Sequence, residues 1–551
     1  MKAMKTINIL LSILLMVSVA SAQEKKIEYL HSGDHMGLFR MGSFAGELIR
    51  SEPAPDNKMV YILKALDANL EVVASSHAMI QMSSRFINMV SNDDRAVLVF
   101  ENSGNEFIEF VKTGPDGRIV SHQIYTDNPN DDYVWNNLSN VTIDEMGLVY
   151  LARYYQKYED DKRRKVEEAG VELLCFGEEF DLKWTKKIKA PGDRVSLNTD
   201  KLVAFNGGCV AMISENSRLD KNFTTALHFV NPQGNVLGKY ELKKGEDIYY
   251  PTSFLAQGDK LVACGMYFDE PWYKALNSAG MFFARFDASG KEVTMQTQGW
   301  KAIDETVNSG NSSDFFFSGK MKVLVHDIYA NANGYNVICE SYQKATGVTG
   351  AEILLDSDNG SNKRSFTIFD FIIFDFDANG KLLKSRKIEK EKRNIEVLGN
   401  IAYKKGVELS FILRDNYLFS YRYVHDDQLV YMNLEDNEPM LYWADLNSGD
   451  VLKHEPIAIQ PVIIEEEDPA AREMIDNSKV LSGLEKFANK VDQVDQKMQD
   501  VGEDLERGIT KNDQVFTIGS PRFGGLVYLG NGVSVSYILF PPQNELYLKK
   551  M

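Results

Sequence analysis

Positive charge is scarce in this chain of 551 residues, in which 61 Lys and Arg stand against 79 Asp and Glu. The formal net charge at neutral pH is −18. Nucleic acids and anionic membranes are bound through clustered Lys and Arg side chains. The charge balance therefore argues against both kinds of partner and agrees with a soluble chain.

Sequence motifs that carry chemistry are also missing. The chain has no Gly-x-Ser-x-Gly, no phosphate-binding Gly loop, no His-Glu-x-x-His and no Cys-x-x-Cys. Its eight His are scattered, with no metal-ligand pair on one element. Asp131-Asp132 and Glu246-Asp247 are adjacent acid pairs of the kind that acid–base catalysis uses, but carboxylates are so abundant that surface solvation is favoured. We expect no cofactor and no metal, and lean against an enzyme.

Long apolar runs are confined to the N-terminus. Residues 1–22 have the form of a signal peptide, with Lys2 and Lys5 before the uncharged run INILLSILLMVSV and a small-x-small cleavage site before Gln23. The run is too short for a spanning helix, and no Cys follows the cleavage site to mark a lipid anchor. We therefore expect export, cleavage at Ala22/Gln23 and a periplasmic or secreted location, with no transmembrane segment.

Cysteine is limited to four residues, Cys175, Cys209, Cys264 and Cys339. Cys264 (LVACGMY) and Cys339 (NVICESY) occupy the same place in two similar apolar segments. Equivalent positions of different repeats are unsuited to the ~6 Å between Cα atoms that a disulfide needs. Because free Cys is among the most buried residue types, we favour four buried thiols over any bridge.

What the sequence does contain is a repeated hairpin. Each copy has an apolar strand, a short turn rich in Asp, Asn, Gly or Ser, and an amphipathic strand, which is the chemistry of tight β-turns. The turns lie near residues 67, 116, 180, 233, 288, 378 and 447. Buried strands opened by a Gly turn precede most hairpins, starting at Gly147, Gly208, Gly258, Gly334 and Gly406.

Repeats of four antiparallel strands at this spacing resemble β-propeller blades. The kelch and WD signatures are absent, and the pattern is most similar to exported bacterial propellers with FDxxGK-type turns. The resemblance implies an all-β propeller with seven blades, or alternatively eight, over residues 23–464 and 511–551. The C-terminal run LVYLGNGVSVSYILF is a hairpin without a blade of its own, which we expect to close the ring with N-terminal strands.

One turn, FDFDANGK at 374–381, has the Asp375-x-Asp377-x-Asn379-Gly380 spacing of the first half of a calcium loop. Such a loop needs a bidentate Glu at position 12. Arg386 stands there instead. We interpret the stretch as a tight turn and not as a metal site.

Residues 465–510 break the strand pattern and predict an inserted amphipathic helix. Apolar residues follow an a/d spacing of 3 and 4, at Val480, Leu484, Phe487, Val491, Val494, Met498, Val501 and Leu505. The seam is compatible with packing on the propeller or with self-association through 480–505. It does not decide between them.

The expected site follows from blade geometry. Tight third-to-fourth turns gather on one face, and longer loops gather on the other, at 155–170, 268–280, 298–320 and 343–366. Long loops on a rigid scaffold commonly bind partners, and Trp and Tyr anchor recognition or stack on sugars. The candidate binding residues are Asp131, Asp132, Trp135, Asp247, Tyr249, Tyr250, Trp272 and Tyr273. The alternative is that these aromatics, and Trp300, pack blades together.

Three functions remain open at this point. The first is an exported, non-enzymatic binding or scaffold protein with a protein or carbohydrate ligand in the cell envelope. The alternative is a carbohydrate-active hydrolase or lyase with acidic and aromatic residues in the central funnel. A third is an envelope protein assembled through the helix. Propellers host many unrelated functions, so the fold alone does not choose among them.

Overall fold

A computed structural model gives the structure of the chain. It describes residues 24–28, 34–41, 44–67, 71–102, 107–126, 133–158, 166–192, 195–217, 223–269, 278–300, 302–303, 321–344, 363–398, 422–425, 427–435, 438–456, 523–530, 533–540 and 545–550. The chain divides into two compact units, Met1–Pro456 with Pro521–Met551, and Ile457–Ser520. Every described residue belongs to the first unit.

The described residues form eight antiparallel sheets, numbered I to VIII here. Sheet I contains β2 (Asp34–Met41), β3 (Phe44–Ala54), β4 (Lys58–Leu66) and β5 (Val72–Gln81). Sheet II contains β6 (Arg85–Ser91), β7 (Ala96–Asn102), β8 (Phe107–Thr113) and β9 (Ile119–Thr126). Sheet III contains β10 (Tyr133–Ile143), β11 (Val149–Tyr158), β12 (Val166–Phe176) and β13 (Leu182–Lys189). Sheet IV contains β14 (Val195–Phe205), β15 (Gly208–Ser217), β16 (Phe223–Val230) and β17 (Val236–Glu241).

The remaining sheets follow the same strand order, with additions. Sheet V contains β18 (Lys243–Lys244), β19 (Asp247–Gln257), β20 (Lys260–Phe268), β21 (Gly280–Asp287) and β22 (Glu292–Gly299). Sheet VI contains β23 (Met321–Asn331), β24 (Gly334–Lys344), β25 (Lys363–Asp377), β26 (Leu382–Ile388) and β27 (Arg393–Leu398). Sheet VII contains β28 (Arg422–His425), β29 (Gln428–Glu435), β30 (Glu438–Asp445) and β31 (Val451–Pro456). Sheet VIII contains β32 (Phe523–Gly530), β33 (Val533–Phe540), β34 (Glu545–Lys550) and β1 (Glu24–Glu28).

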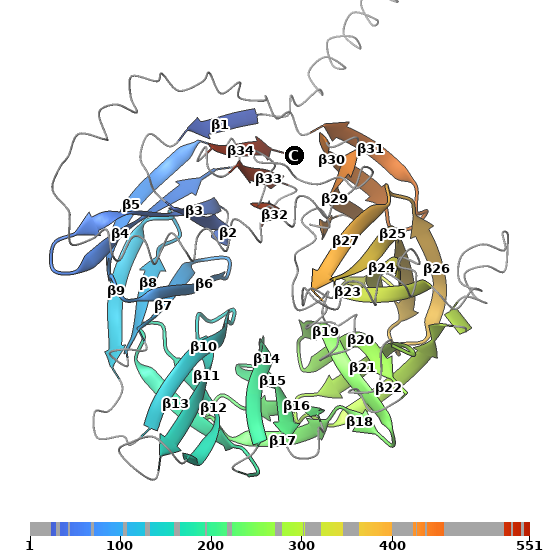
Figure 1. Cartoon of the computed structure of the whole chain (residues 1–551), viewed down its shortest axis with the longest axis horizontal. Helices are drawn as coiled ribbons and strands as arrows, with labels where there is room; N and C mark the ends of the chain where they lie inside the picture. The colour runs from blue at the N-terminus through green and yellow to red at the C-terminus, as the bar shows by residue number, and fades with distance from the viewer. Residues whose placement is uncertain are drawn as a thin grey trace, which may run out of the picture. The chain divides into compact units, whose positions relative to one another are not determined.

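The sheets of this unit follow one another in a closed circle of contacts. One strand of each of sheets I to V contacts its counterpart in the next, in the order β2, β6, β10, β14, β19 and β23, and β32 contacts both β28 and β2. Sheets VI and VII share a core in which Phe371 packs against Tyr431. The strands that make these contacts lie toward the middle of Figure 1, and the strands that follow the tight turns lie outside, namely β5, β9, β13, β17, β22, β26 and β31. This all-β arrangement of four-stranded antiparallel sheets is that of a β-propeller.

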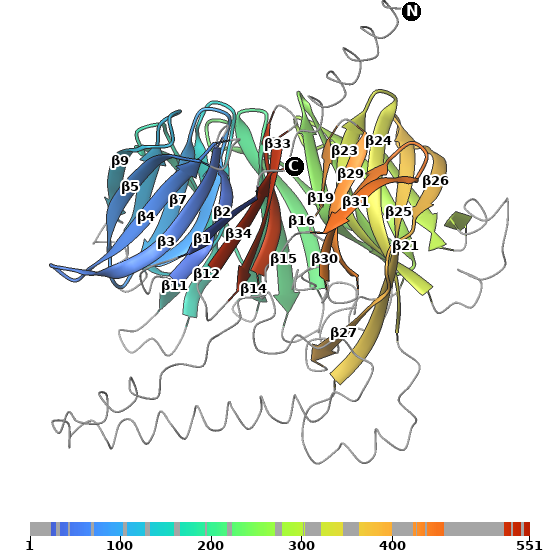
Figure 2. The same cartoon turned by 90° about the horizontal axis from the view of Figure 1, so that it is seen from above.

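The sequence of each sheet dictates its burial. Second strands are buried along much of their length, as β7 is at every residue. Fourth strands alternate between exposed and half-buried residues, as β17 does, because one face of an outer strand meets water. In sheet VI, β25 is long, and its first residues pair with β27. Figure 2 shows these two strands extending beyond the others of the sheet.

The tight turns confirm the hairpin prediction. Each of the seven predicted turns joins the third and fourth strands of one of sheets I to VII. The four cysteines, all within the described ranges, are buried and form no disulfide, which confirms the preference for buried thiols. The C-terminal hairpin of β32 and β33 shares a sheet with the N-terminal strand β1, and β34 lies between β33 and β1.

The turn glycines let neighbouring sheets approach closely. Gly234 and Gly290 have φ of +79° and +82°, a region that favours glycine. A Cβ on Gly234 would lie 2.8 Å from the Trp184 ring of sheet III, and one on Gly290 would lie 2.5 Å from the Phe229 ring of sheet IV. Gly380 faces Phe283 of sheet V in the same way. The repeated glycine therefore supplies both the turn and the inter-sheet contact.

Several predictions fall on residues outside the described ranges. These are the signal peptide, the inserted helix at 465–510 and the buried strand expected from Gly406. Within the described ranges no complete helix is formed, and only Trp300, Ala302 and Ile303 have helical backbone. No helix among these residues is long and apolar enough to cross a membrane.

Candidate functional site

The calcium-like turn at the end of β25 is closed by its own side chains. Asp377 Oδ1 accepts hydrogen bonds from the backbone N of Asn379 at 2.8 Å and of Lys381 at 2.9 Å. Asp287 makes the same pair of bonds in sheet V, to the backbone N of Ser289 at 2.9 Å and of Lys291 at 3.0 Å. Asp is used at both positions because its carboxylate satisfies the turn's backbone donors.

Asp375 is committed to a different partner. Arg386 donates from both terminal nitrogens to the two Asp375 oxygens, one bond being 2.8 Å, and Lys384 Nζ lies 3.9 Å away. Burial raises the pKa of the Asp375 carboxyl, although the two cations oppose this shift. The cation at position 12 of the calcium-like spacing is thus the ion-pair partner of the residue at position 1. No group of three or more His, Cys, Asp or Glu within the described part of the chain is placed to hold a metal.

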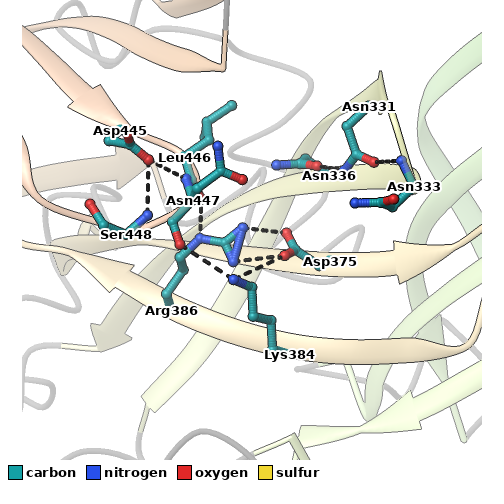
Figure 3. A network of polar contacts seen from close by, with 10 residues as sticks. All are labelled: Asn331, Asn333, Asn336, Asp375, Lys384, Arg386, Asp445, Leu446, Asn447 and Ser448. Carbon is teal, nitrogen blue, oxygen red and sulfur yellow. Dashed lines mark hydrogen bonds and ion pairs between the residues drawn. The ribbon is translucent and has the colours of Figure 1, made fainter.

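This ion pair lies beside a pocket of about 260 Å³ where tight turns of sheets VI and VII meet. Its polar lining comprises Asn331, Asn333, Asp375, Lys384, Asp427 and Asn447. Ala332, Phe376 and Leu383 complete it. The lining residues lie in or beside four turns, β23–β24, β25–β26, β28–β29 and β30–β31. Figure 3 shows Asp375, Lys384 and Arg386 from sheet VI facing the Asp445–Ser448 turn of sheet VII.

Neighbouring groups fix several of the lining side chains. Asn331 Oδ1 accepts a hydrogen bond from the backbone N of Asn333 at 2.8 Å, and its Nδ2 donates to Asn336. Lys384 Nζ donates to the backbone O of Asn447 at 3.3 Å. Arg386 Nε donates to the backbone O of Leu446. The cations of sheet VI therefore hold the turn of sheet VII in place.

Backbone geometry places the remaining acid. Asp427 has φ of +59° in the turn between β28 and β29. Asp and Asn tolerate this left-handed conformation better than other residues with a side chain. Asp427 is exposed, so its carboxylate meets solvent at the pocket.

Of the residues predicted from loop geometry, the described Asp247, Tyr249 and Tyr250 do not line this pocket. Asp131, Asp132, Trp272 and Tyr273 lie outside the described residues. The backbone of Trp135 is in β10, opposite Tyr155 of β11.

Within β19, Asp247 is half-buried, and its backbone pairs with Lys244 of β18. Tyr249 and Tyr250 are only 3% and 6% exposed and belong to the hydrophobic core. Tyr249 packs edge-on against Phe282 with ring centroids 5.3 Å apart. Burial raises the pKa of both phenols. Trp300 is also buried, and its Nε1 donates to Ser278. For these rings the burial agrees with the packing alternative.

Sequence reasoning missed the pocket because its residues come from four turns with ordinary turn composition. One feature of the sequence did point to this region of the chain. A cation stands where a calcium loop needs its closing carboxylate, and that cation is Arg386.

Comparison with known proteins identifies no family. No protein-family model matches the chain, and no curated protein matches it. Solved structures similar to it include the Dos1 propeller, with 8% identity and a TM-score of 0.40 over 96% of this chain and 95% of that one. The β-propeller domain of the trilobed protease from Pyrococcus furiosus has 10% identity and a TM-score of 0.37, over 79% and 98%. The polysaccharide lyase Uly1 has 9% identity and a TM-score of 0.36, over 95% and 90%. Likenesses at this level carry no argument about function.

Proposed function

We propose that this protein is an exported, non-enzymatic binding protein, built on a β-propeller in which each of the eight sheets is one blade. The observation that carries the proposal is the fixed polar lining of the pocket between sheets VI and VII. Arg386 holds Asp375, and the backbone of Asn333 holds the amide of Asn331. Groups that are ordered before a ligand arrives reduce the entropy lost on binding.

The state of the carboxylates supports binding over hydrolysis. A glycoside hydrolase needs two carboxyls facing each other across the substrate, about 5–9.5 Å apart. Asp375 is instead tied to Arg386. Elsewhere, buried Glu172 pairs with Arg153 at 2.7 Å. Such pairs stabilise the sheets, and removing one partner of a buried pair is costly.

The long-loop face stays a second predicted binding surface, for a protein or carbohydrate in the cell envelope. Trp272→Ala should melt close to the wild type and lose a co-purifying partner if the ring is an anchor. A large fall in melting temperature with the partner retained would assign the ring to packing. Self-association through residues 480–505 likewise stays a prediction.

Ligand screening tests the proposed function. The mature chain is screened by thermal shift against small polar compounds, including sugars, amino acids and nucleosides, since a ligand that binds only the folded state raises the melting temperature. Hits are titrated into the wild type and into Asn333→Ala, with Asn379→Ala as the matched control, because Asn379 lies in an exposed turn of the same sheet and does not line the pocket.

Binding that is lost only in Asn333→Ala supports the proposal. Turnover of a glycan substrate by the wild type, seen as new reducing ends or unsaturated products, would instead favour the hydrolase or lyase alternative. The absence of any hit sensitive to Asn333→Ala would refute a binding role for this pocket.

A further inference from the structure

The charges around the pocket indicate the class of its ligand. Lys384, Asp375 and Asp427 line it, and Arg386 stands behind Asp375. These four groups carry two charges of each sign, and Asp445 adds a negative charge that acts on Arg386. An anion that approached Lys384 would also meet Asp375, which lies 3.9 Å from the ammonium. A cation drawn to Asp427 would share the pocket with the ammonium of Lys384. The electrostatics therefore favour a neutral ligand.

The lining of the pocket offers both hydrogen-bond donors and hydrogen-bond acceptors. The side-chain amides of Asn331, Asn333 and Asn447 each combine a donor and an acceptor. Asp427 adds acceptors and Lys384 adds donors. A hydroxyl group is itself one donor and two acceptors, so a polyol matches such a lining better than a ligand with acceptors alone. The amide of Asn331 is already oriented by two bonds.

The apolar surface and the volume of the pocket restrict the class of ligand further. Leu383 lines the pocket and is 53% exposed, which leaves an aliphatic surface beside the polar groups. The pocket, at about 260 Å³, is just below the ~300–1,000 Å³ typical of sites for drug-sized ligands. That size suits one sugar ring, which has a rim of hydroxyls and an apolar C–H face.

We propose, on the basis of the binding function above, that the pocket takes a neutral carbohydrate through a single pyranose-sized unit. The aromatic residue in the lining, Phe376, is only 1% exposed, so its ring offers little stacking surface. Affinity for one unit should accordingly be weak, with a Kd of about 1 mM.

The experiment titrates four probes into the mature protein by calorimetry and ligand-observed NMR. They are a neutral methyl pyranoside panel, a uronic acid, an amino sugar and a free amino acid. Neutral pyranosides should bind with a Kd that stays within about twofold from roughly 0.05 to roughly 0.5 M NaCl, because salt screens only charged contacts. Preference for a charged probe with a strong salt dependence would overturn the neutral class and leave the binding function intact.

Variants tie the binding to the pocket. Asn333→Ala and Leu383→Ser should each weaken pyranoside binding by about fivefold or more, and Asn379→Ala should leave it within about twofold. Asp427→Asn keeps a residue that tolerates the turn's positive φ and removes the charge. It should change the Kd of a neutral sugar by less than about fivefold. Tighter binding of the amino sugar than of the neutral pyranosides, lost in Asp427→Asn, would show that a positive charge on the ligand is recognised and would overturn the neutral class.

A failure of the carbohydrate inference can be distinguished from a failure of the proposed binding function. If no pyranoside binds while the wider screen finds another ligand that is lost in Asn333→Ala, the carbohydrate class is refuted and the binding function stands. If pyranosides bind equally to Asn333→Ala, Leu383→Ser and the wild type, the pocket is not their site and the inference fails. Circular dichroism and melting of each variant check that it is folded.

Discussion

Substitution of one turn glycine tests whether the repeated turns dock neighbouring sheets. Gly290 has φ of +82°, and a Cβ there would lie 2.5, 2.8 and 3.0 Å from three atoms of the Phe229 ring. Phe229 is buried and packs against Phe286 with centroids 5.8 Å apart, so the ring has little room to move. Gly290→Ala should therefore be destabilising for two separate reasons, backbone strain and overpacking.

Each contribution has an expected size. A left-handed conformation costs a residue with a Cβ about 1–2 kcal/mol, and an extra methyl group in a packed site costs about 1–3 kcal/mol. Gly245 of the same sheet supplies the control, because its φ is +64° and a Cβ added there would have no atom within 4 Å. Gly245→Ala carries the strain and the unfolded-state entropy of the Gly→Ala change without the clash. The difference between the two variants should therefore be about 1–3 kcal/mol.

Urea unfolding followed by circular dichroism measures both variants, with stability compared at equal m values. A double-mutant cycle isolates the contact. In a Phe229→Ala background, itself destabilised by about 3–5 kcal/mol, Gly290→Ala should cost no more than Gly245→Ala. Equal costs of the two glycine substitutions in the wild type, or an unchanged cost of Gly290→Ala without the Phe229 ring, would refute the docking role.

Three further predictions concern single side chains. Calcium titration should give no heat attributable to the turn at 374–381. Asp377→Ala should lower the free energy of unfolding by about 1 kcal/mol, because two hydrogen bonds to the backbone are lost. A micromolar calcium site abolished by that variant would contradict the turn interpretation. Burial raises the pKa of Cys175 to about 12, so a thiol reagent should not react with the folded protein, and should count four thiols after unfolding. Burial also raises the pKa of Glu47 to about 7, above its unfolded value of 4.5. As the pH rises from about 4.5 to about 7, the free energy of unfolding of the wild type should fall relative to that of Glu47→Gln, by about 3 kcal/mol in total. A difference between the two proteins that does not change with pH would contradict this prediction.

The tight turns were the part of the fold that could be predicted from the sequence. Tight β-turns depend on local chemistry, as in Asp377-Ala-Asn-Gly380, where a carboxylate satisfies two N–H groups and a glycine adopts φ of +82°. Local chemistry of this kind is visible in a single sequence. The alternation of strand burial is visible for the same reason, because it follows the two-residue period of a strand.

Contacts between segments that are far apart in the sequence could not be predicted in this way. Tyr249 and Tyr250 follow an acidic loop whose pattern predicts ligand binding, yet both rings belong to the core of sheet V. Adjacent residues of a strand point to opposite faces, and here both faces are covered. The pocket shows the same limit, since Asn331 and Asn447 come together only once sheets VI and VII are neighbours.

The junction between sheets VI and VII differs from three of the earlier junctions in what its turn glycine contacts. Gly234, Gly290 and Gly380 each approach an aromatic ring of the preceding sheet, whereas Gly449 lies against the backbone of Lys387. Arg386 instead reaches the backbone of Leu446 across this junction. An aromatic ring fills a junction by contact in all directions, but a buried guanidinium must keep its planar donors on acceptors. Directional bonds leave space that a ring would occupy, and the pocket lies beside them, at the turn end of a junction whose core still contains the Phe371–Tyr431 contact.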